Sequence, residues 1–392
     1  MNDTCSMDLR IELDHLKQND LLRELRTFGI IDAVRLDYQG RTVLNFASND
    51  YLGLSKDARV INAAVRALES YGTGSGASRL VSGSLIIHAE LEERIAAFKR
   101  KERAVAFPTG YMANVGIINA LFSKGDQLII DKLSHASIID ACAMSQAEVR
   151  VFPHKNYKRL REILKRTSSF KKRCIITDSV FSMDGDCADL RELIEIKHDH
   201  GAILMIDEAH ATGVFGTFGR GLAEEQGVED EIDICMGTLS KALGGLGGYI
   251  AGDNDLIRFM HNKARSFIYT TALSPATCAG IIAAIDIIEE DISLRQTLWN
   301  NVKMVQDYLK DIIGINVGSQ SPIIPVIVGE STAALELSDR MLERGFFMPA
   351  VRYPTVPRKS ARLRISLSAA HTENDIRRML NALGEEYSKI IG

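Results

Sequence analysis

Five residues that can bind ligands or move protons stand at or just after four short apolar runs of the sequence. His135 follows QLIID, Ser182 follows CIITD, Asp207 ends AILMID and is followed by His210, and Lys241 follows DICMG. Lys241 lies among small residues and glycines in TLSKALGGLGG, whereas surface lysines usually have charged neighbours. A structural role explains each residue equally well or better when it is taken alone. Their recurrence at four successive strand ends favours an active site.

Asp207 and Lys241 together indicate the chemistry of pyridoxal phosphate. That cofactor is held as a Schiff base on a lysine, and a carboxylate keeps its ring nitrogen protonated so that the ring can accept electrons. Poor solvation and a neighbouring cationic ring lower the pKa of such a lysine, which makes it a better nucleophile and base. In this setting we expect the two histidines, His135 and His210, to stack on the ring and to bond its 3′ oxygen.

A glycine turn before an amphipathic stretch supplies a candidate phosphate site. Gly110 and Tyr111 begin the expected helix of GYMANVGIINALF, where free N–H groups and the helix dipole favour an anion. Thr238 and Ser240 could add hydroxyl donors. An ordinary glycine turn explains TGYMAN equally well when it is taken alone. The second glycine-rich segment, YGTGSGASRLVSG, lacks a full G-x-G-x-x-G pattern, so we interpret it as a tight loop near the active site.

The elements that must position these residues form an α/β pattern. Apolar runs alternate with helix-sized gaps, which predicts a mostly parallel central sheet with ligands at the carboxyl ends of its strands. Leucine spacing predicts a helix over residues 8–27. Near the C-terminus, a β-α-β pattern and a closing helix from about 373 predict a smaller α+β domain. We expect an N-terminal helix and arm over 1–50, a large cofactor-binding domain over 51–285 and a small domain over 286–392.

Composition limits the classes of partner. The chain has 392 residues and a formal net charge of -4, which gives no electrostatic reason to bind nucleic acid or an anionic membrane. No apolar run reaches the length of a membrane span, and the first residues do not predict a secretory signal. The six cysteines, Cys5 among them, have no metal-ligand spacing and suit a reducing compartment. We therefore expect a cytoplasmic protein without a metal site.

Nine segments resemble, in chain order, the α-oxoamine synthases, which are fold-type-I pyridoxal-phosphate enzymes that condense an amino acid with an acyl thioester. The resemblance runs from about residue 20 to the C-terminus. Two further segments, SFIYTTALSP and RYPTVP, are most similar to the branch of that family that joins L-alanine to a pimeloyl thioester in biotin synthesis. The resemblance implies a homodimer and a condensation that releases carbon dioxide and the thiol carrier. It leaves open whether that carrier is coenzyme A or an acyl carrier protein. The nine segments are NFASNDYLGL, GTGSGASRLVSG, HAELE, GYMAN, LSHASI, VFSMDGD, DEAHATGVFG, TLSKALGGLGG and ARLRISLSAAHT.

The resemblance also implies a role for each matched position. Lys241 would carry the cofactor and remove the α-proton, Asp207 would pair with the ring nitrogen, and His135 would stack on the ring and assist the acyl step. The remaining cofactor contacts would be His210 and Ser182 on the 3′ oxygen side, Gly110, Tyr111 and Thr238 on the phosphate, and Thr270 and Thr271 across a dimer interface. The substrate contacts would be Asn49 and Arg364 on the amino-acid carboxylate, and Arg23 and Thr355 on the acyl group. Arg362, two residues before Arg364, is expected to face the opposite way and to be structural.

Two other functions fit parts of the sequence. A sister enzyme of the same family would use glycine and acetyl-CoA, and an assay of alanine against glycine separates the two. A non-catalytic or sphingolipid-type subunit would keep the fold without the activity. The presence of Lys241, Asp207 and His210 argues against a dead subunit, and the lack of an apolar membrane segment argues against the lipid role.

Overall fold

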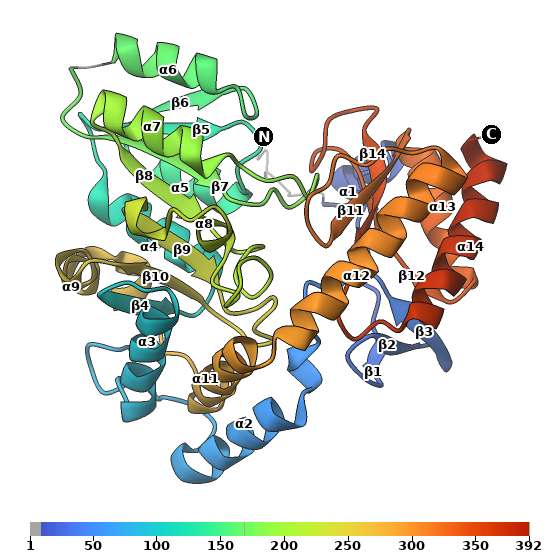
Figure 1. The fold of residues 1–392 in the computed structure, drawn as a ribbon, viewed down its shortest axis with the longest axis horizontal. Helices are drawn as coiled ribbons and strands as arrows, with labels where there is room; N and C mark the ends of the chain where they lie inside the picture. The colour runs from blue at the N-terminus through green and yellow to red at the C-terminus, as the bar shows by residue number, and fades with distance from the viewer. Residues whose placement is uncertain (1–8, 168, 392) are drawn as a thin grey trace, which may run out of the picture.

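A seven-stranded sheet forms the centre of the chain in the computed structural model, which describes residues 9–167 and 169–391 (Figure 1). Cys5 lies outside these described residues. Strands β9, β8, β7, β5 and β6 run parallel, and β10 pairs antiparallel with both β9 and β4. The predicted mostly parallel α/β sheet is therefore confirmed. In sheet order, the strands are β4 (Arg103–Phe107), β10 (Gly248–Gly252), β9 (Ile234–Thr238), β8 (Ile203–Asp207), β7 (Arg173–Asp178), β5 (Gln127–Asp131) and β6 (Glu148–Phe152).

The central strands are apolar along their whole length because helices cover both faces of the sheet. Ile129 of β5 packs into one core, and its neighbours Leu128 and Ile130 pack into the other. The first face is covered by α3 (Ile86–Phe98), α6 (Tyr157–Arg166), α7 (Leu190–His200) and α11 (Pro275–Glu290), with α2 (Ala58–Tyr71) lying against α11. The opposite face is covered by α4 (Gly110–Leu121), α5 (Ala136–Met144) and α9 (Asn254–Lys263).

The C-terminal segment and the N-terminal strands build two smaller sheets. Figure 1 shows α12 running from the large sheet toward the right-hand part of the molecule, where α13 and α14 cover these strands. The three-stranded sheet has the order β11-β14-β13, and the four-stranded sheet has the order β1-β2-β3-β12. Their bounds are β11 (Ile323–Gly329), β14 (Ala361–Ser366), β13 (Ala350–Val351), β1 (Gly29–Ile30), β2 (Arg35–Tyr38), β3 (Arg41–Asn45) and β12 (Phe346–Phe347). The helices are α12 (Ile292–Tyr308), α13 (Ser331–Glu343) and α14 (Glu373–Ile391), and the short elements are η1 (Leu54–Lys56), α8 (Leu222–Glu225), η2 (Glu229–Glu231), α10 (Arg265–Ile268) and η3 (Leu309–Ile313).

The N-terminal strands join this C-terminal part through main-chain pairing. β12 runs parallel to β3, with Phe346 paired to Leu44 and Phe347 to Asn45. The β-α-β pattern predicted near the C-terminus is found as β11, α13 and β14, and the closing helix is found as α14. The division of the chain at residues 50 and 285 stays a prediction; residue 285 lies within α11.

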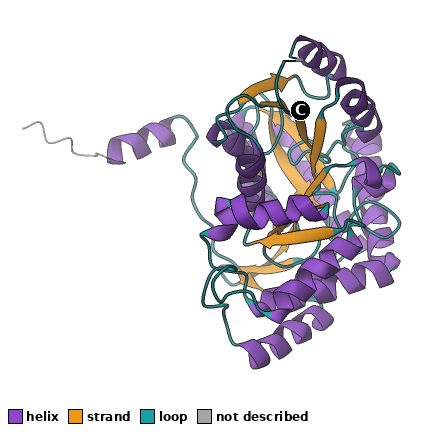
Figure 2. Cartoon of the chain, turned by 90° about the vertical axis from the view of Figure 1, so that its left-hand side faces the viewer, coloured by secondary structure: helices purple, strands orange, loops and turns teal. Residues whose placement is uncertain are grey.

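The N-terminal helix is shorter than predicted. α1 spans Leu9–Gln18, and residues 21–28 form no helix, so the expectation of a helix to residue 27 is wrong. The chain reverses at Asp20, whose φ is 55°, and the amides of Leu21 and Leu22 bond back to the carbonyl of Leu16. This local closure ends the helix although the leucine spacing continues. No residue of α1 is buried, and Figure 2 shows the helix projecting away from the body of the chain.

None of the helices in the described part of the chain is long and apolar enough to span a membrane.

Candidate active site

Lys241 and Asp207 come from neighbouring parallel strands of the central sheet. Asp207 ends β8 and is 3% exposed, and Lys241 follows the end of β9 by three residues. Burial lowers the pKa of the Lys241 amine to about 8, against the opposing attraction of Asp207 and Asp178, while Arg364 lowers it further. The neutral fraction of this amine near physiological pH is therefore much larger than that of an ordinary lysine, and only the neutral amine attacks a carbonyl.

The Asp207 carboxylate is held by two donors. The Ala209 amide donates to Oδ1 at 2.9 Å, and the Asn114 side-chain amide of α4 donates to Oδ2 at 2.9 Å. Asn114 is fully buried. Gly110 and Tyr111 of the same helix were predicted site residues, whereas Asn114 was not. Its position one turn into that helix was the available signal, because residues four apart share a helix face.

His135 caps helix α5 and contacts a second buried acid. Its amide donates to Asp178 Oδ2 at 3.0 Å, and its Nδ1 accepts from the Ser137 amide at 3.2 Å. Burial lowers the pKa of His135, with Lys241 acting in the same direction and Asp207 opposing. Burial and the nearby Asp207 raise the pKa of Asp178 well above its usual range. Asp178 was noted in the sequence only as a strand end.

A hydrogen-bonded chain connects His210 to Arg364. His210 Nδ1 lies 2.7 Å from the Tyr51 hydroxyl, which lies 3.2 Å from Asn49 Oδ1. Arg364 donates to the same Asn49 oxygen at 3.1 Å. Burial lowers the pKa of His210 well below its usual value, and the Lys241, Arg364 and His135 charges add to this effect. The structure thus brings together three residues expected at the site and adds Tyr51, which sequence reasoning missed.

Arg364 is buried without a carboxylate partner in the described chain. It is 8% exposed and donates to the Ser182 carbonyl at 2.6 Å, to the Ser366 hydroxyl at 2.6 Å and to Asn49. These partners are neutral oxygens, so none of them is a counter-ion for the guanidinium. A buried, uncompensated cation of this kind suits the binding of a ligand carboxylate.

The expectation that Arg362 faces away from Arg364 is wrong. Arg362 donates to the Met183 carbonyl at 3.2 Å and pairs with Asp184 at 2.6 Å, while Arg364 contacts neighbouring Ser182. Both arginines therefore contact one loop, because residues two apart in a strand point to the same face. The two arginines differ in their ion pairs, because Arg362 has a carboxylate partner in Asp184 and Arg364 has none in the described chain.

The residues expected to hold a phosphate lie at the N-terminus of α4. Gly110 and Tyr111 are its first two residues, and the first amides of a helix have no carbonyl partner within it. A Cβ on Gly110 would lie 3.2 Å from Met236 and 3.6 Å from Thr238, so the glycine allows close approach to β9. The Thr238 hydroxyl bonds the Gly247 carbonyl at 2.8 Å and Ser240 at 2.6 Å.

Four of the predicted site residues, Thr270, Thr271, Arg23 and Thr355, form no hydrogen bond with the strand-end residues in the described part of the same chain. Thr270 and Thr271 follow α10, and Thr271 forms an isolated bridge with Ser78 of the glycine-rich loop. Arg23 donates to the Thr355 hydroxyl at 3.3 Å on the surface. A hollow of about 990 Å³ opens beside Arg23 and is lined by residues 22–28 and by parts of β2, α13 and the β12–β13 region.

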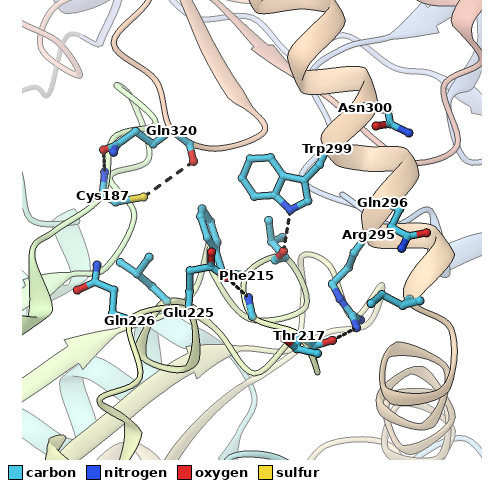
Figure 3. A pocket seen from close by; sticks show the side chains of 14 residues that line it. Cys187, Phe215, Thr217, Glu225, Gln226, Arg295, Gln296, Trp299, Asn300 and Gln320 are labelled. Atoms are coloured by element: carbon cyan, nitrogen blue, oxygen red, sulfur yellow. Dashed lines mark hydrogen bonds between the residues drawn. The ribbon is translucent and has the colours of Figure 1, made fainter.

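A different hollow lies away from these groups, between the loop after β8 and the start of α12 (Figure 3). Its volume is about 740 Å³, and Phe215, Arg295 and Trp299 line it. Arg295 holds this loop by donating to the Thr217 carbonyl at 2.5 Å. No lysine, histidine or aspartate lines the hollow, so it contains none of the predicted catalytic residues.

The donor set of the strand-end cluster fits pyridoxal phosphate. It offers an amine of lowered pKa at Lys241, a buried carboxylate at Asp207, a helix N-terminus with a glycine for close approach, and an unpaired guanidinium for a substrate carboxylate. These are the groups that a lysine-bound cofactor with an anionic tail requires.

The chain is similar to known proteins over nearly its whole length. Residues 41–383 match the family described as aminotransferase class I and II. The 8-amino-7-oxononanoate synthase of Geobacter metallireducens is 45% identical over 379 residues, covering 95% of this chain and 97% of the relative. The protein of the same name from Thermoanaerobacter pseudethanolicus is 43% identical over 376 residues, covering 95% of each.

Solved structures share the fold. The serine palmitoyltransferase of Sphingomonas wittichii has a TM-score of 0.92 and 30% identity, covering 100% of this chain and 99% of that one. Another serine palmitoyltransferase, solved with pyridoxal phosphate as an internal aldimine, has a TM-score of 0.92 and 30% identity, covering 97% of each chain.

Proposed function

The chain belongs to the aminotransferase class I and II family, and we propose that it catalyses the 8-amino-7-oxononanoate synthase reaction. L-Alanine and a pimeloyl thioester are joined, and the products are 8-amino-7-oxononanoate, carbon dioxide and the free thiol carrier, a step of biotin biosynthesis. Relatives of that name at 43–45% identity over 95% of the chain support this reaction within the predicted α-oxoamine synthase family. Within the site, the observation that carries it is Arg364, a buried guanidinium free to bind a substrate carboxylate.

Pyridoxal phosphate is the cofactor, and its residues come from the carboxyl ends of the central strands. Lys241 would bond it covalently, Asp207 would pair with its ring nitrogen, and His135 would stack on its ring. When bound, the protonated ring accepts the electron pair left by a broken bond at the substrate α-carbon. The other contacts would be His210 and Ser182 near the 3′ oxygen, and Gly110, Tyr111 and Thr238 at the phosphate.

Arg364 and Asn49 bind and orient the carboxylate of L-alanine. The Arg364 guanidinium can pair with the carboxylate through two parallel N–H groups, and Asn49 Oδ1 fixes one edge of the guanidinium at 3.1 Å. Lys241 would accept the α-proton at its Nζ. A pKa of about 8 leaves a share of this amine unprotonated and able to act as that base.

His135 assists the acyl step by donating a hydrogen bond to the thioester oxygen. Its lowered pKa keeps the imidazole neutral, so it polarises this oxygen without bringing a full charge. Arg23 and Thr355, which bond each other at 3.3 Å, contact the acyl chain. The 990 Å³ hollow beside Arg23 offers room for a long acyl substrate. Either coenzyme A or an acyl carrier protein can present it.

The active unit is a homodimer that shares its active sites. Leu80, Val81 and Ile86 are 58–79% exposed around the glycine-rich loop, and Tyr269 is 70% exposed beside Thr270. The bridge between Ser78 and Thr271 brings these segments together. A grouped set of exposed apolar side chains marks an interaction surface, which supports a second subunit here. Thr270 and Thr271 would then reach the partner's phosphate.

A cytoplasmic location and the three-part domain division complete the proposal. The five cysteines of the described residues are free and buried, which supports a reducing compartment. The large cofactor-binding part over 51–285 holds Lys241 and Asp207, and the small part over 286–392 supplies Arg364. The site therefore forms where the two parts meet.

The choice of amino acid separates this function from its alternatives. We would titrate the purified, cofactor-loaded protein with L-alanine, glycine and L-serine, following the visible absorbance of the cofactor. L-Alanine should give the largest spectral change at the lowest concentration. Preference for glycine would indicate glycine C-acetyltransferase activity, and preference for serine would indicate the palmitoyltransferase activity named for the structural relatives.

A further inference from the structure

Asn114 and Ser137 connect Asp207 to His135 by hydrogen bonds through the interior of the protein. The Asn114 side-chain amide lies 2.9 Å from Asp207 Oδ2 and 2.9 Å from Ser137 Oγ. Ser137 Oγ lies 2.8 Å from His135 Nδ1. Asn114 is 0% and Ser137 is 1% exposed, so both bonds of the Asn114 amide are shielded from water, whereas the His135 end of the network is exposed.

One backbone amide determines the direction of every hydrogen bond between Asp207 and His135. The Ser137 N–H lies 3.2 Å from His135 Nδ1, and a backbone N–H can only donate. His135 Nδ1 is therefore an acceptor and carries no proton. The Ser137 hydroxyl donates to the same nitrogen and accepts one Asn114 hydrogen, and the second Asn114 hydrogen goes to Asp207. A neutral His135 then carries its proton on Nε2.

The orientation of the Asn114 side-chain amide leaves its Oδ1 buried without a hydrogen-bond partner in the described chain, which costs free energy. Turning the amide over would place that oxygen against the Asp207 carboxylate, where two acceptors repel. An apolar side chain among the buried neighbours Ala113 and Ile117 would avoid the cost. The asparagine is therefore explained by its two donated bonds.

We propose that Asn114 is a positioning residue for both ends of the site, with Ser137 as its link to His135. Asn114 holds Asp207 Oδ2 as an acceptor. It also orients the Ser137 hydroxyl, whose bond to His135 Nδ1 adds to that of the Ser137 amide in leaving the His135 proton on Nε2, the nitrogen free to donate to a substrate oxygen. The assignment rests on the proposed function, because it gives Asp207 and His135 their tasks toward cofactor and substrate.

Asn119 provides a matched control on the same helix. Its side-chain amide donates to the Val115 carbonyl at 3.0 Å and to the Ala141 carbonyl of α5 at 3.1 Å. It therefore joins the same two helices through its bond to Ala141, and it has no hydrogen bond to Asp207 or His135 in the described chain. A purely structural role for Asn114 predicts equal effects for the two asparagines.

NMR of the histidine side-chain nitrogens in the apoprotein reports the tautomer and the protonation state of His135 directly. The wild type, Asn114→Leu, Ser137→Ala and Asn119→Leu are labelled with ¹⁵N-histidine, and His135→Gln assigns the signal. We expect the Nε2-protonated form in the wild type and in Asn119→Leu. In Asn114→Leu and Ser137→Ala, the His135 imidazole should titrate at higher pH than in the wild type. The titratable groups around its ring are the same in these variants, namely Lys241, Asp207, Asp178, Asp140 and His210. Asn114→Ala replaces the leucine variant if the latter does not fold.

The affinity for pyridoxal phosphate tests the role of the hydrogen bond from Asn114 to Asp207. Asn114→Leu should raise the Kd roughly ten-fold, the effect of losing a hydrogen bond to a charged group. Ser137→Ala and Asn119→Leu should leave this Kd near that of the wild type. A wild-type His135 protonated on Nδ1, or an Asn114 variant that matches the Asn119 variant in both measurements, would overturn the proposal. A wild type that shows the expected His135 state but binds no cofactor would instead reject the proposed function.

Discussion

Arg364 and Arg362 lie on the same face of β14, and of the two only Arg362 has a carboxylate partner within the described chain. Arg362 pairs with Asp184 at 2.6 Å, whereas Arg364 donates only to the neutral oxygens of Ser182, Ser366 and Asn49. Both side chains are at most 8% exposed. A cation kept in a buried site without a counter-ion is costly, so Arg364 is explained by a carboxylate that arrives with the substrate.

Replacing Arg364 should therefore weaken substrate binding. Arg364→Ala is expected to raise the Kd for L-alanine roughly 30-fold or more, because a buried, charge-assisted contact is lost. The absorbance of the bound cofactor before alanine is added should stay unchanged. Arg362→Ala is the matched control, and it should lower thermal stability while leaving the Kd for alanine near that of the wild type. Equal effects of both variants on this Kd would show that the carboxylate site is misassigned.

The rate at which the apoprotein takes up pyridoxal phosphate should follow the ionisation of Lys241. Only the neutral amine attacks the aldehyde, so the rate rises with pH and reaches half its maximum near pH 8, where the pKa lies. Asp207 raises this pKa, so Asp207→Asn should move the half-maximum to lower pH. Rapid mixing with absorbance detection measures both curves. A half-maximum near the ordinary lysine value of 10.5 would contradict the buried environment of this amine.

Asp207→Asn should keep the cofactor bound but slow proton removal. The neutral amide can still accept from the Ala209 amide, but it cannot balance a protonated ring. Exchange of the alanine α-hydrogen with deuterated solvent should fall roughly 100-fold, as for loss of an electrostatic contact in a catalytic site. Asp178→Asn is the control and should change exchange less, because burial and Asp207 already raise the pKa of Asp178. Near-normal exchange in Asp207→Asn would leave Asp207 with a structural role only.

Mixed dimers test whether active sites are shared between subunits. One subunit carries Lys241→Ala, and the other carries Thr270→Val together with Thr271→Val. If each site takes Lys241 from one subunit and the threonines from the other, one hybrid site has both defects and the second has none. Activity should then return after the two inactive proteins are unfolded, mixed and refolded. No recovery, with hybrid dimers shown by mass spectrometry, would mean that each chain builds its own site.

Much of the site was predictable because parallel strands end at one edge of a sheet. Asp178 pairs with Asp207 and Asp207 with Met236 in register, so residues that follow these strands meet in space. Alternating strand and helix patterns were enough to place Lys241 beside Asp207.

The parts that the sequence did not reveal depend on side-chain direction and on distant contacts. Asn114 and Tyr51 act through hydrogen bonds to Asp207 and His210, which no local pattern encodes. The end of α1 was missed because leucine spacing continues past Asp20, where the backbone reverses. The facing of Arg362 follows from the two-residue repeat of a strand, and its role follows only from its partner Asp184.

The most direct test of the proposed reaction uses L-alanine labelled at its carboxyl carbon. The cofactor-loaded protein is incubated with this alanine and pimeloyl-CoA, and labelled carbon dioxide and free thiol are measured together. We expect equal amounts of both products, formed only when both substrates are present and abolished in Lys241→Ala. We also expect slower turnover of glycine with acetyl-CoA and of serine with palmitoyl-CoA. Thiol release without labelled carbon dioxide, or faster turnover of either alternative pair, would contradict the proposed reaction.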